Sequence, residues 1–368
     1  MLCVLPGVLE VRAKPFLCKS ELMSEDLPTF ERPRKEISGL PSVVQCSLLN
    51  ELLINSDDKI FITSLIEHFK GVKIETQTNN FTNQGKERKM SKSDSTLIAI
   101  GGGEFSETSD ILKEFLGLLK NKSDARIVVV TVATNEPEAS AQKYNSLFRG
   151  QGIKHVNVVD VSGRDDAFNE SALKKIRDAD ALFFTGGDQL NVTSLLGGSP
   201  LHNLIHERYK AGFIIAGTSA GAMMMSNSMI TEGRNDIAPR VDCIKIAPGM
   251  DLIGETIIDT HFSQRGRHGR LLTALAHYPQ DLGIGIDEKT AICVEGDEFR
   301  VLGEGVVTVM DGNQMRHSNL AYRHASEPLG LFGVCTHILP AGYRYNLKKR
   351  EPISPALKTL TASTTNEE

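Results

Sequence analysis

The chain has 368 residues, of which 40% are hydrophobic and 24% charged, and a formal net charge of −5. This is the composition of an ordinary soluble globular protein, long enough for one large domain or two modest ones. The acidic balance argues against a general nucleic-acid-binding protein, and no apolar run approaches the roughly 20 residues that span a bilayer.

The amino-terminal part differs in character from the rest. Residues 1–89 are mostly polar and contain several prolines, with only a short amphipathic piece near 47–69. We predict a poorly structured extension, and two explanations stay open: a real extension, or a translation start placed too early, with Met90 as the natural start. We expect the folded domain over residues 90–350 and a flexible tail over 351–368.

From residue 96 onward, short apolar strands alternate with segments of helical spacing. Strands are predicted at 96–103, 126–134, 155–161, 181–187 and 212–217, and helices at 106–120, 137–150, 169–180, 199–212 and 218–228. Such alternation predicts an α/β fold with a doubly wound, mostly parallel sheet. The strand-rich segments after residue 280 are predicted to add strands at one side of the same domain.

Three glycine-rich loops follow predicted strands, at 101–103, 186–187 and 217–221. Loops at the carboxyl ends of parallel strands build the site in such folds. The third loop, GTSAG, fits G-x-S-x-G between an apolar strand and a helix-forming segment, the setting of a strained serine on a sharp turn. We predict that Ser219 is a nucleophile, favoured by a helix amino terminus. The alternative is a serine that only caps the helix.

A serine nucleophile needs a base, a group that orients the base and an oxyanion hole. His261 and Glu288 each stand at the end of an apolar strand, where a parallel sheet would present them beside the serine; spacing alone leaves open whether they meet. The amides of Ala220 and Gly187 are candidates for the oxyanion hole. The alternative for Gly187 is a plain strand-to-helix turn.

Histidines and cysteines are common metal ligands, and this chain contains both. His202 and His206 lie four residues apart on a predicted helix, and we interpret them as surface residues, with no metal or cofactor expected. The six cysteines are scattered without a C-x-x-C pair. Reduced thiols and the absence of a basic segment at the start of the chain predict a cytoplasmic protein.

Three arginines, Arg265, Arg267 and Arg270, follow His261 closely. Arginine suits substrate carboxylates, which it can hold through two parallel hydrogen bonds. This predicts an acidic substrate such as an aspartyl peptide, and Asp259 and Asp188 could hold a cationic group of the same substrate. The alternative is a solvated charged surface.

In this order, the segments IAIGGGE, FFTGGDQ, GTSAGAMMMS, DTHFSQRGRHGRL and GIDEKTAI resemble the peptidase family of the cyanophycinases and α-aspartyl dipeptidases, over roughly residues 90–320. The resemblance implies a flavodoxin-like α/β fold, akin to class I glutamine amidotransferases, and a Ser219-His261-Glu288 triad. It implies hydrolysis of cyanophycin, a polyaspartate that carries arginine on each β-carboxyl, to β-Asp-Arg dipeptides. It also implies a homodimer and a substrate site lined by Gln189, Asp259, Arg265, Arg267 and Arg270. Thr260 departs from the glutamine of the cyanophycinase pattern, which leaves the substrate contact at this position open.

Three other functions were weighed. The nearest is a peptidase of the same family that cleaves short α-aspartyl peptides. A nucleotide-binding protein with a phosphate loop at 98–104 is disfavoured, because G-x-G-x-x-G requires a glycine where Ser106 stands. A catalytically inactive binding protein is disfavoured because Ser219, His261 and Glu288 are all present.

Overall fold

The computed structural model describes residues 95–103, 107–235, 238–324 and 327–355. The extension predicted for residues 1–89 lies outside this range, as does most of the predicted tail. The described residues belong to one compact unit, Lys86–Glu368. Within them, no helix is both long enough and apolar enough to cross a membrane.

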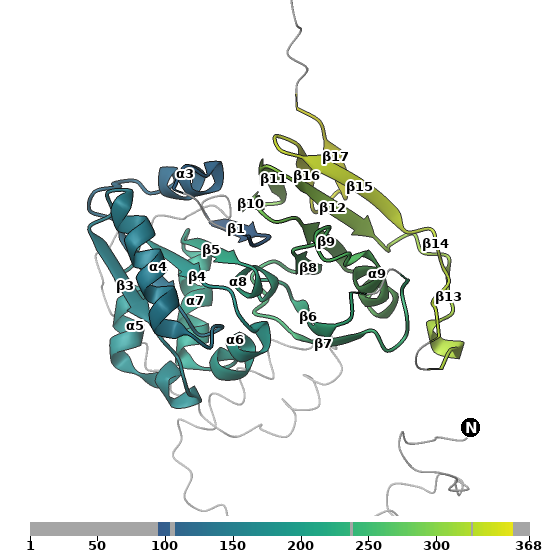
Figure 1. Cartoon of the computed structure of the whole chain (residues 1–368), viewed down its shortest axis with the longest axis horizontal. Coiled ribbons are helices and arrows are strands. Elements are labelled where there is room, and N and C mark those ends of the chain that lie inside the picture. The colour runs from purple at the N-terminus through teal and green to yellow at the C-terminus, as the bar shows by residue number, and fades with distance from the viewer. Residues whose placement is uncertain (1–94, 104–106, 236–237, 325–326, 356–368) are drawn as a thin grey trace, which may run out of the picture. The chain divides into compact units, whose positions relative to one another are not determined.

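A nine-stranded sheet forms the core of the fold (Figure 1). Its strands are β1 Thr96–Ile100, β2 Arg126–Val130, β3 His155–Val159, β4 Ala181–Phe184, β5 Ile214–Thr218, β10 Thr290–Glu295, β11 Glu298–Gly303, β16 Arg344–Asn346 and β17 Glu351–Ile353. The order is β17-β16-β11-β10-β1-β5-β4-β2-β3. Strands β3-β2-β4-β5-β1 are parallel, and the other four continue antiparallel. The predicted α/β class, with a mostly parallel sheet and added carboxy-terminal strands, is confirmed.

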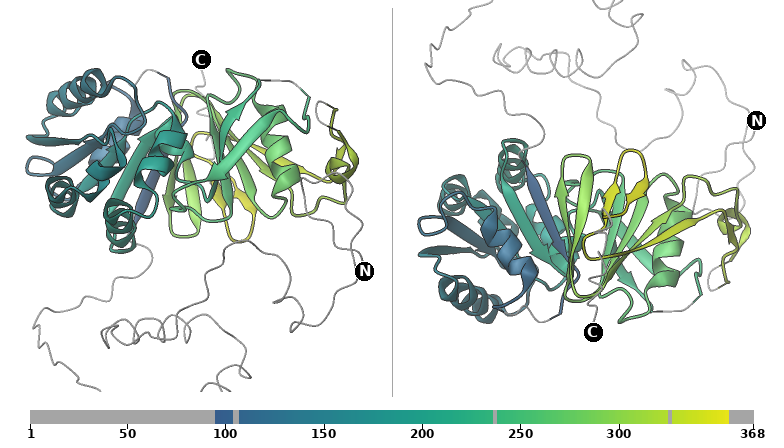
Figure 2. Two further views of the ribbon diagram at one scale, coloured as in Figure 1. Left: turned by 90° about the horizontal axis from the view of Figure 1, so that it is seen from below. Right: turned by 90° about the horizontal axis from the view of Figure 1, so that it is seen from above.

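Helices cover both faces of the parallel strands (Figure 2). They are α3 Asp110–Gly117, α4 Pro137–Gly150, α5 Glu170–Arg177, α6 Gln189–Leu196, α7 Pro200–Lys210 and α8 Ala220–Met223, with a 3₁₀ turn at Arg164–Phe168. Helix α9 His268–His277 packs instead on the second sheet, described below, and a further 3₁₀ turn lies at Leu320–Tyr322. Successive strand residues point to opposite faces. Thus Ile98 shares a core cluster with Phe115 of α3 on one face, and Leu97 belongs to the cluster that includes Ile176 of α5 on the other. Burial on both faces explains the unbroken apolar run of β1.

A second, four-stranded sheet has the order β15-β12-β9-β8. Its strands are β8 Thr256–Thr260, β9 Leu282–Ile286, β12 Val306–Asp311 and β15 Cys335–Pro340. The expectation that the sheet of the serine strand also presents His261 is therefore wrong, because β8 pairs with β9 and not with β5. The chain passes from the second sheet to the first through the three residues between β9 and β10. The prediction failed because an apolar run does not indicate which strand it will pair with.

Two hairpins complete the described fold, β6 Ser228–Gly233 with β7 Ile244–Pro248, and β13 His317–Ser318 with β14 Leu331–Phe332. Neither hairpin was predicted from the sequence. The predicted flexible tail, residues 351–368, is wrong for residues 351–353, because Glu351–Ile353 pairs with β16 as strand β17.

Candidate active site

Ser219 occupies a sharp turn between β5 and α8. Its backbone has φ 54° and ψ −115°, a strained conformation for a residue other than glycine. The flanking glycines are required by space, since a Cβ on Gly217 would lie 2.1 Å from the carbonyl oxygen of Gly221. The helix that follows has only four residues. The predicted helix is therefore a single turn, and little of the expected helix dipole is available at the serine.

Three polar side chains form a continuous hydrogen-bonded chain. The Oγ of Ser219 lies 2.9 Å from Nε2 of His261, and Nδ1 of His261 lies 2.7 Å from Oε1 of Glu288. The histidine side chain is 12% exposed and the glutamate 37%. The structure thus brings together the three residues selected from the sequence, in the geometry of nucleophile, base and orienting carboxylate.

The glycine loop after β1 connects the three turns that carry these side chains. Successive carbonyl oxygens of Ile100, Gly101 and Gly102 accept hydrogen bonds from the amides of Ser219 (2.9 Å), His261 (2.8 Å) and Lys289 (2.9 Å). Lys289 directly follows Glu288, so one loop fixes turns that arise from both sheets. The sequence placed this loop among the glycine-rich loops of the predicted site but did not predict its hydrogen bonds to the three turns.

Gly102 also provides space for the imidazole. Its φ is +96°, and a Cβ there would lie 2.3 Å from Cε1 of His261. We predict that Gly102→Ala displaces the ring and lowers kcat by about 100-fold, since a shift near 1 Å can cost that much. Steady-state hydrolysis measures the effect. Gly117→Ala is the control, because that site is open. Unchanged kcat in Gly102→Ala would contradict this role.

Burial lowers the pKa of His261 below its ordinary 6.5. The hydrogen bond that His261 donates to Glu288 opposes that shift, whereas the positive charges of Arg265 and Arg267 add to it. Burial disfavours the charged imidazolium, as do neighbouring cations. The ring therefore remains neutral, and able to accept a proton, down to a lower pH than a free histidine does.

A pH profile tests this arrangement. Only neutral His261 can accept the serine proton, so kcat/KM should fall as the pH drops through its pKa, with the midpoint below pH 6.5. Arg265→Gln removes a cation that lowers this pKa and should move the midpoint to higher pH. Arg177→Gln on α5 is the remote control. A midpoint that Arg265→Gln leaves in place would contradict the assignment.

The two candidate oxyanion donors flank the serine. Ala220 directly follows it, and the loop of Gly186 and Gly187 lies beside it: a Cβ on Gly186 would be 3.3 Å from Cβ of Ser219. Gly187 has φ +144°, and a Cβ there would lie 2.0 Å from the carbonyl oxygen of Ala133. Only glycine permits this close approach. The role of both amides remains a prediction.

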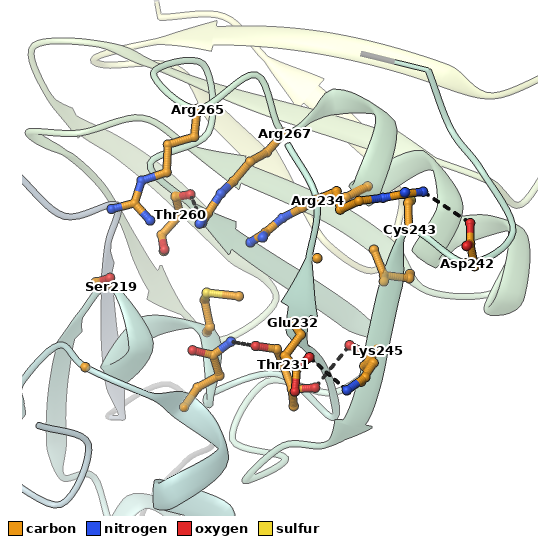
Figure 3. Close-up of a pocket in the computed structure, with 16 residues that line it drawn as sticks. Ser219, Thr231, Glu232, Arg234, Asp242, Cys243, Lys245, Thr260, Arg265 and Arg267 are labelled. Atoms are coloured by element: carbon orange, nitrogen blue, oxygen red, sulfur yellow. Dashed lines mark hydrogen bonds and ion pairs between the residues drawn. The ribbon is translucent and has the colours of Figure 1, made fainter. Parts of the chain in front are cut away.

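A pocket of about 560 Å³ opens beside Ser219 (Figure 3). Its wall includes the three sequence-predicted arginines, Gln189 and the β6–β7 hairpin. Gln189 is buried, and its Nε2 donates to the carbonyl oxygens of Ile230 (2.6 Å) and Thr231 (3.0 Å). The amide nitrogen of Gln189 therefore holds the hairpin against the loop that carries Gly187.

The arginines divide into one exposed and two buried residues. Arg265 is exposed, and none of the ion pairs found among the described residues involves it. Arg267 and Arg270 are 8% and 4% exposed. Arg267 donates to Asp259 (3.1 Å) and to the carbonyl oxygen of Thr260 (2.6 Å). Arg270 binds both carboxylate oxygens of Asp259. Burial lowers the pKa of Arg267 to about 10, although Asp259 opposes this shift.

The expectation that Asp259 binds a cationic group of the substrate is therefore corrected. Its side chain is fully buried, and both oxygens are occupied by guanidinium groups of the chain itself. It fixes Arg267 and Arg270 from beneath the pocket. The carboxylate of Asp188 also has a partner within the chain, because it caps α6 by accepting a hydrogen bond from the amide of Leu190 (2.8 Å).

The histidines of α7 are half-buried and not surface residues. Their rings pack edge to face with centroids 4.6 Å apart, and Nε2 of His206 lies 2.7 Å from the carbonyl oxygen of Met250. Within the described part of the chain, no group of three His, Cys, Asp or Glu residues could hold a metal ion.

Comparisons with known proteins identify the family of this chain. The model of peptidase family S51 matches residues 97–302. A cyanophycinase of Geminocystis herdmanii (strain PCC 6308) is 37% identical over 263 residues, 71% of this chain and 96% of the relative. A cyanophycinase of Trichormus variabilis is 35% identical over 269 residues, 72% of this chain and 90% of the relative. A peptidase E of Shewanella denitrificans is 28% identical over 156 residues, 40% of this chain and 63% of the relative.

Proposed function

We infer the function of this chain from its family: the chain belongs to peptidase family S51 and is a serine-type peptidase. Within that family we propose a serine exopeptidase that hydrolyses cyanophycin to β-Asp-Arg dipeptides. The observation that carries the proposal is the hydrogen-bonded chain of Ser219, His261 and Glu288, at a pocket lined by both cationic and acidic side chains.

The proposed reaction begins with proton transfer from Oγ of Ser219 to Nε2 of His261. Glu288, bound to Nδ1, orients the ring and stabilises the imidazolium. The serine oxygen attacks an aspartyl carbonyl carbon, and the amides of Gly187 and Ala220 stabilise the resulting oxyanion. His261 then protonates the leaving amine as the acyl-enzyme forms. A water molecule, deprotonated by His261, releases the product and restores the serine.

The charges of the pocket are compatible with this polymer. Cyanophycin carries a carboxyl terminus and one guanidinium group on each residue of its polyaspartate backbone. Exposed Arg265 is suited to a carboxylate, and Arg267 lies beside it with its Nε without a hydrogen-bond partner among the described residues. These arginines support a substrate whose acidic group lies near the serine.

A second candidate is a peptidase that cleaves short α-aspartyl peptides. The similarity to a peptidase E favours it, but that match spans 40% of this chain, against 71% for the cyanophycinase of Geminocystis herdmanii. A cytoplasmic location and a homodimer also belong to the proposal. Fractionation of cells and the molar mass in solution test these two points.

The deciding experiment incubates the purified protein with insoluble cyanophycin and identifies the soluble products by mass spectrometry, with Ser219→Ala alongside. Release of β-Asp-Arg by the native protein alone is expected. Inert polymer combined with cleavage of free aspartyl dipeptides would move the assignment to the second candidate. Equal release by Ser219→Ala would overturn the proposed nucleophile.

A further inference from the structure

Neither acid predicted from the sequence to bind a cationic substrate group lines the pocket: Asp259 is buried beside two arginines, and Asp188 caps α6. The pocket nevertheless has two acidic side chains in its wall, Glu232 and Asp242, beside five cationic ones. Both acids belong to the β6–β7 hairpin and its loop. We propose that Glu232 and Asp242 form the subsite that binds the guanidinium group of the substrate; this inference rests on the proposed function.

The hairpin is held at a fixed place relative to the nucleophile. Its register shifts between Ile230 and Glu232, so that Thr231 is the extra residue of a β-bulge. Bulges re-aim neighbouring side chains and occur often beside active sites. The carbonyl oxygens at this bulge accept from Nε2 of Gln189, which stands two residues after Gly187. Glu232 is thereby anchored to the same loop that lies beside Ser219.

Each acid is paired with a cation of the chain itself. Oε2 of Glu232 lies 2.8 Å from Nζ of Lys245, and Oδ1 of Asp242 lies 3.2 Å from a guanidinium nitrogen of Arg234. The acidic side chains are 64% and 41% exposed. Exposed pairs of this kind contribute little to stability. An incoming guanidinium group can therefore replace Lys245 or Arg234 at little cost.

Between Ser219 and the hairpin acids, the pocket wall carries a buried donor that favours an anionic group. Arg267 lines it and is more than nine-tenths buried, yet its Nε has no hydrogen-bond partner among the described residues. Because a buried donor without an acceptor costs free energy, this site favours a ligand that supplies an acceptor, such as a carboxylate. Figure 3 shows Ser219 and Asp242 at opposite ends of the pocket, with Arg267 between them in that view. A substrate that carries both charges then lies with its carboxylate at Arg267 and its guanidinium at the hairpin.

The test compares two synthetic peptides with a short α-linked polyaspartate backbone, one carrying arginine on each β-carboxyl and the other citrulline, which keeps the shape of arginine and removes its charge. The measured quantity is the ratio of kcat/KM for the arginyl over the citrullyl peptide. We expect this ratio to fall by about tenfold in Glu232→Gln and in Asp242→Asn, because each loses a charge-assisted hydrogen bond. Glu170→Gln on α5, which breaks an exposed pair with Arg177 (3.2 Å), is the matched control and should keep the native ratio.

The outcomes separate the two proposals. A native protein that cleaves both peptides, with the same ratio in the native protein and in both pocket variants, overturns the guanidinium subsite and leaves the proposed function intact. A native protein that cleaves neither peptide overturns the proposed function and the subsite with it. Thermal unfolding of the variants near the native midpoint excludes misfolding as the cause of a lower ratio.

Discussion

Ser219→Ala is expected to lower kcat on cyanophycin by about 10⁴-fold, because alanine removes the atom that forms the acyl-enzyme. The residual rate would come from binding and from the oxyanion donors alone. The fold should be unaffected, since the φ of 54° is retained and the serine side chain makes one hydrogen bond, to His261. Product release followed by mass spectrometry measures the effect.

Two controls sharpen this prediction. A fluorophosphonate probe should label the native protein and not Ser219→Ala, whereas Ser123→Ala, in an exposed turn, should be labelled like the native protein. His261→Ala should be about as slow as Ser219→Ala, and the double variant no slower than either, because residues that act as one unit are not additive. A loss below about tenfold in Ser219→Ala would rule out the acyl-enzyme mechanism.

The turn of Ser219 and the parallel part of the sheet could be predicted because their signals are local. An apolar strand followed by GTSAG fixes the position of the serine, and alternating strand and helix patterns fix the class of fold. His261 and Glu288 were selected from strand ends and from a family resemblance. That the two side chains meet Ser219 depends on carbonyl oxygens of the β1 loop, which are contacts between segments far apart in the sequence.

The rest of the site depends on long-range pairing that no local pattern records. Segments 255–262 and 283–287 have the same apolar character as β5, yet they form a different sheet. The β6–β7 hairpin, which carries Glu232, has a mixed polar sequence without strict alternation and was missed. A bulge that shifts the register at Thr231 interrupts the period-two pattern by which strands are recognised.

Charged residues were the hardest to place. Arg267 and Arg270 lie in a run that resembles a solvated surface, and such side chains are rarely buried unless they are paired. Their burial follows from one partner, Asp259, which stands eight and eleven residues earlier in the chain. Because composition does not reveal which carboxylate a guanidinium group will meet, the sequence assigned Asp259 to the substrate instead of to the arginines.

The pairing of Asp259 leads to the largest expected effect on stability. Its carboxylate is fully buried between two guanidinium groups that are themselves nearly buried. Asp259→Asn leaves both cations without a counter-charge, and removal of one partner from a buried ion pair costs about 3–5 kcal/mol. We expect the free energy of unfolding, measured in urea, to fall by that amount.

Asp242→Asn is the matched control, because it makes the same chemical change in an exposed pair with Arg234 and should alter the free energy of unfolding by less than about 1 kcal/mol. Equal, small losses in the two variants would show that Asp259 is solvated and free to bind substrate. A large loss confined to Asp259→Asn assigns that carboxylate to the arginines of its own chain. The hairpin acids then remain as the carboxylates through which the pocket wall can bind a cationic group.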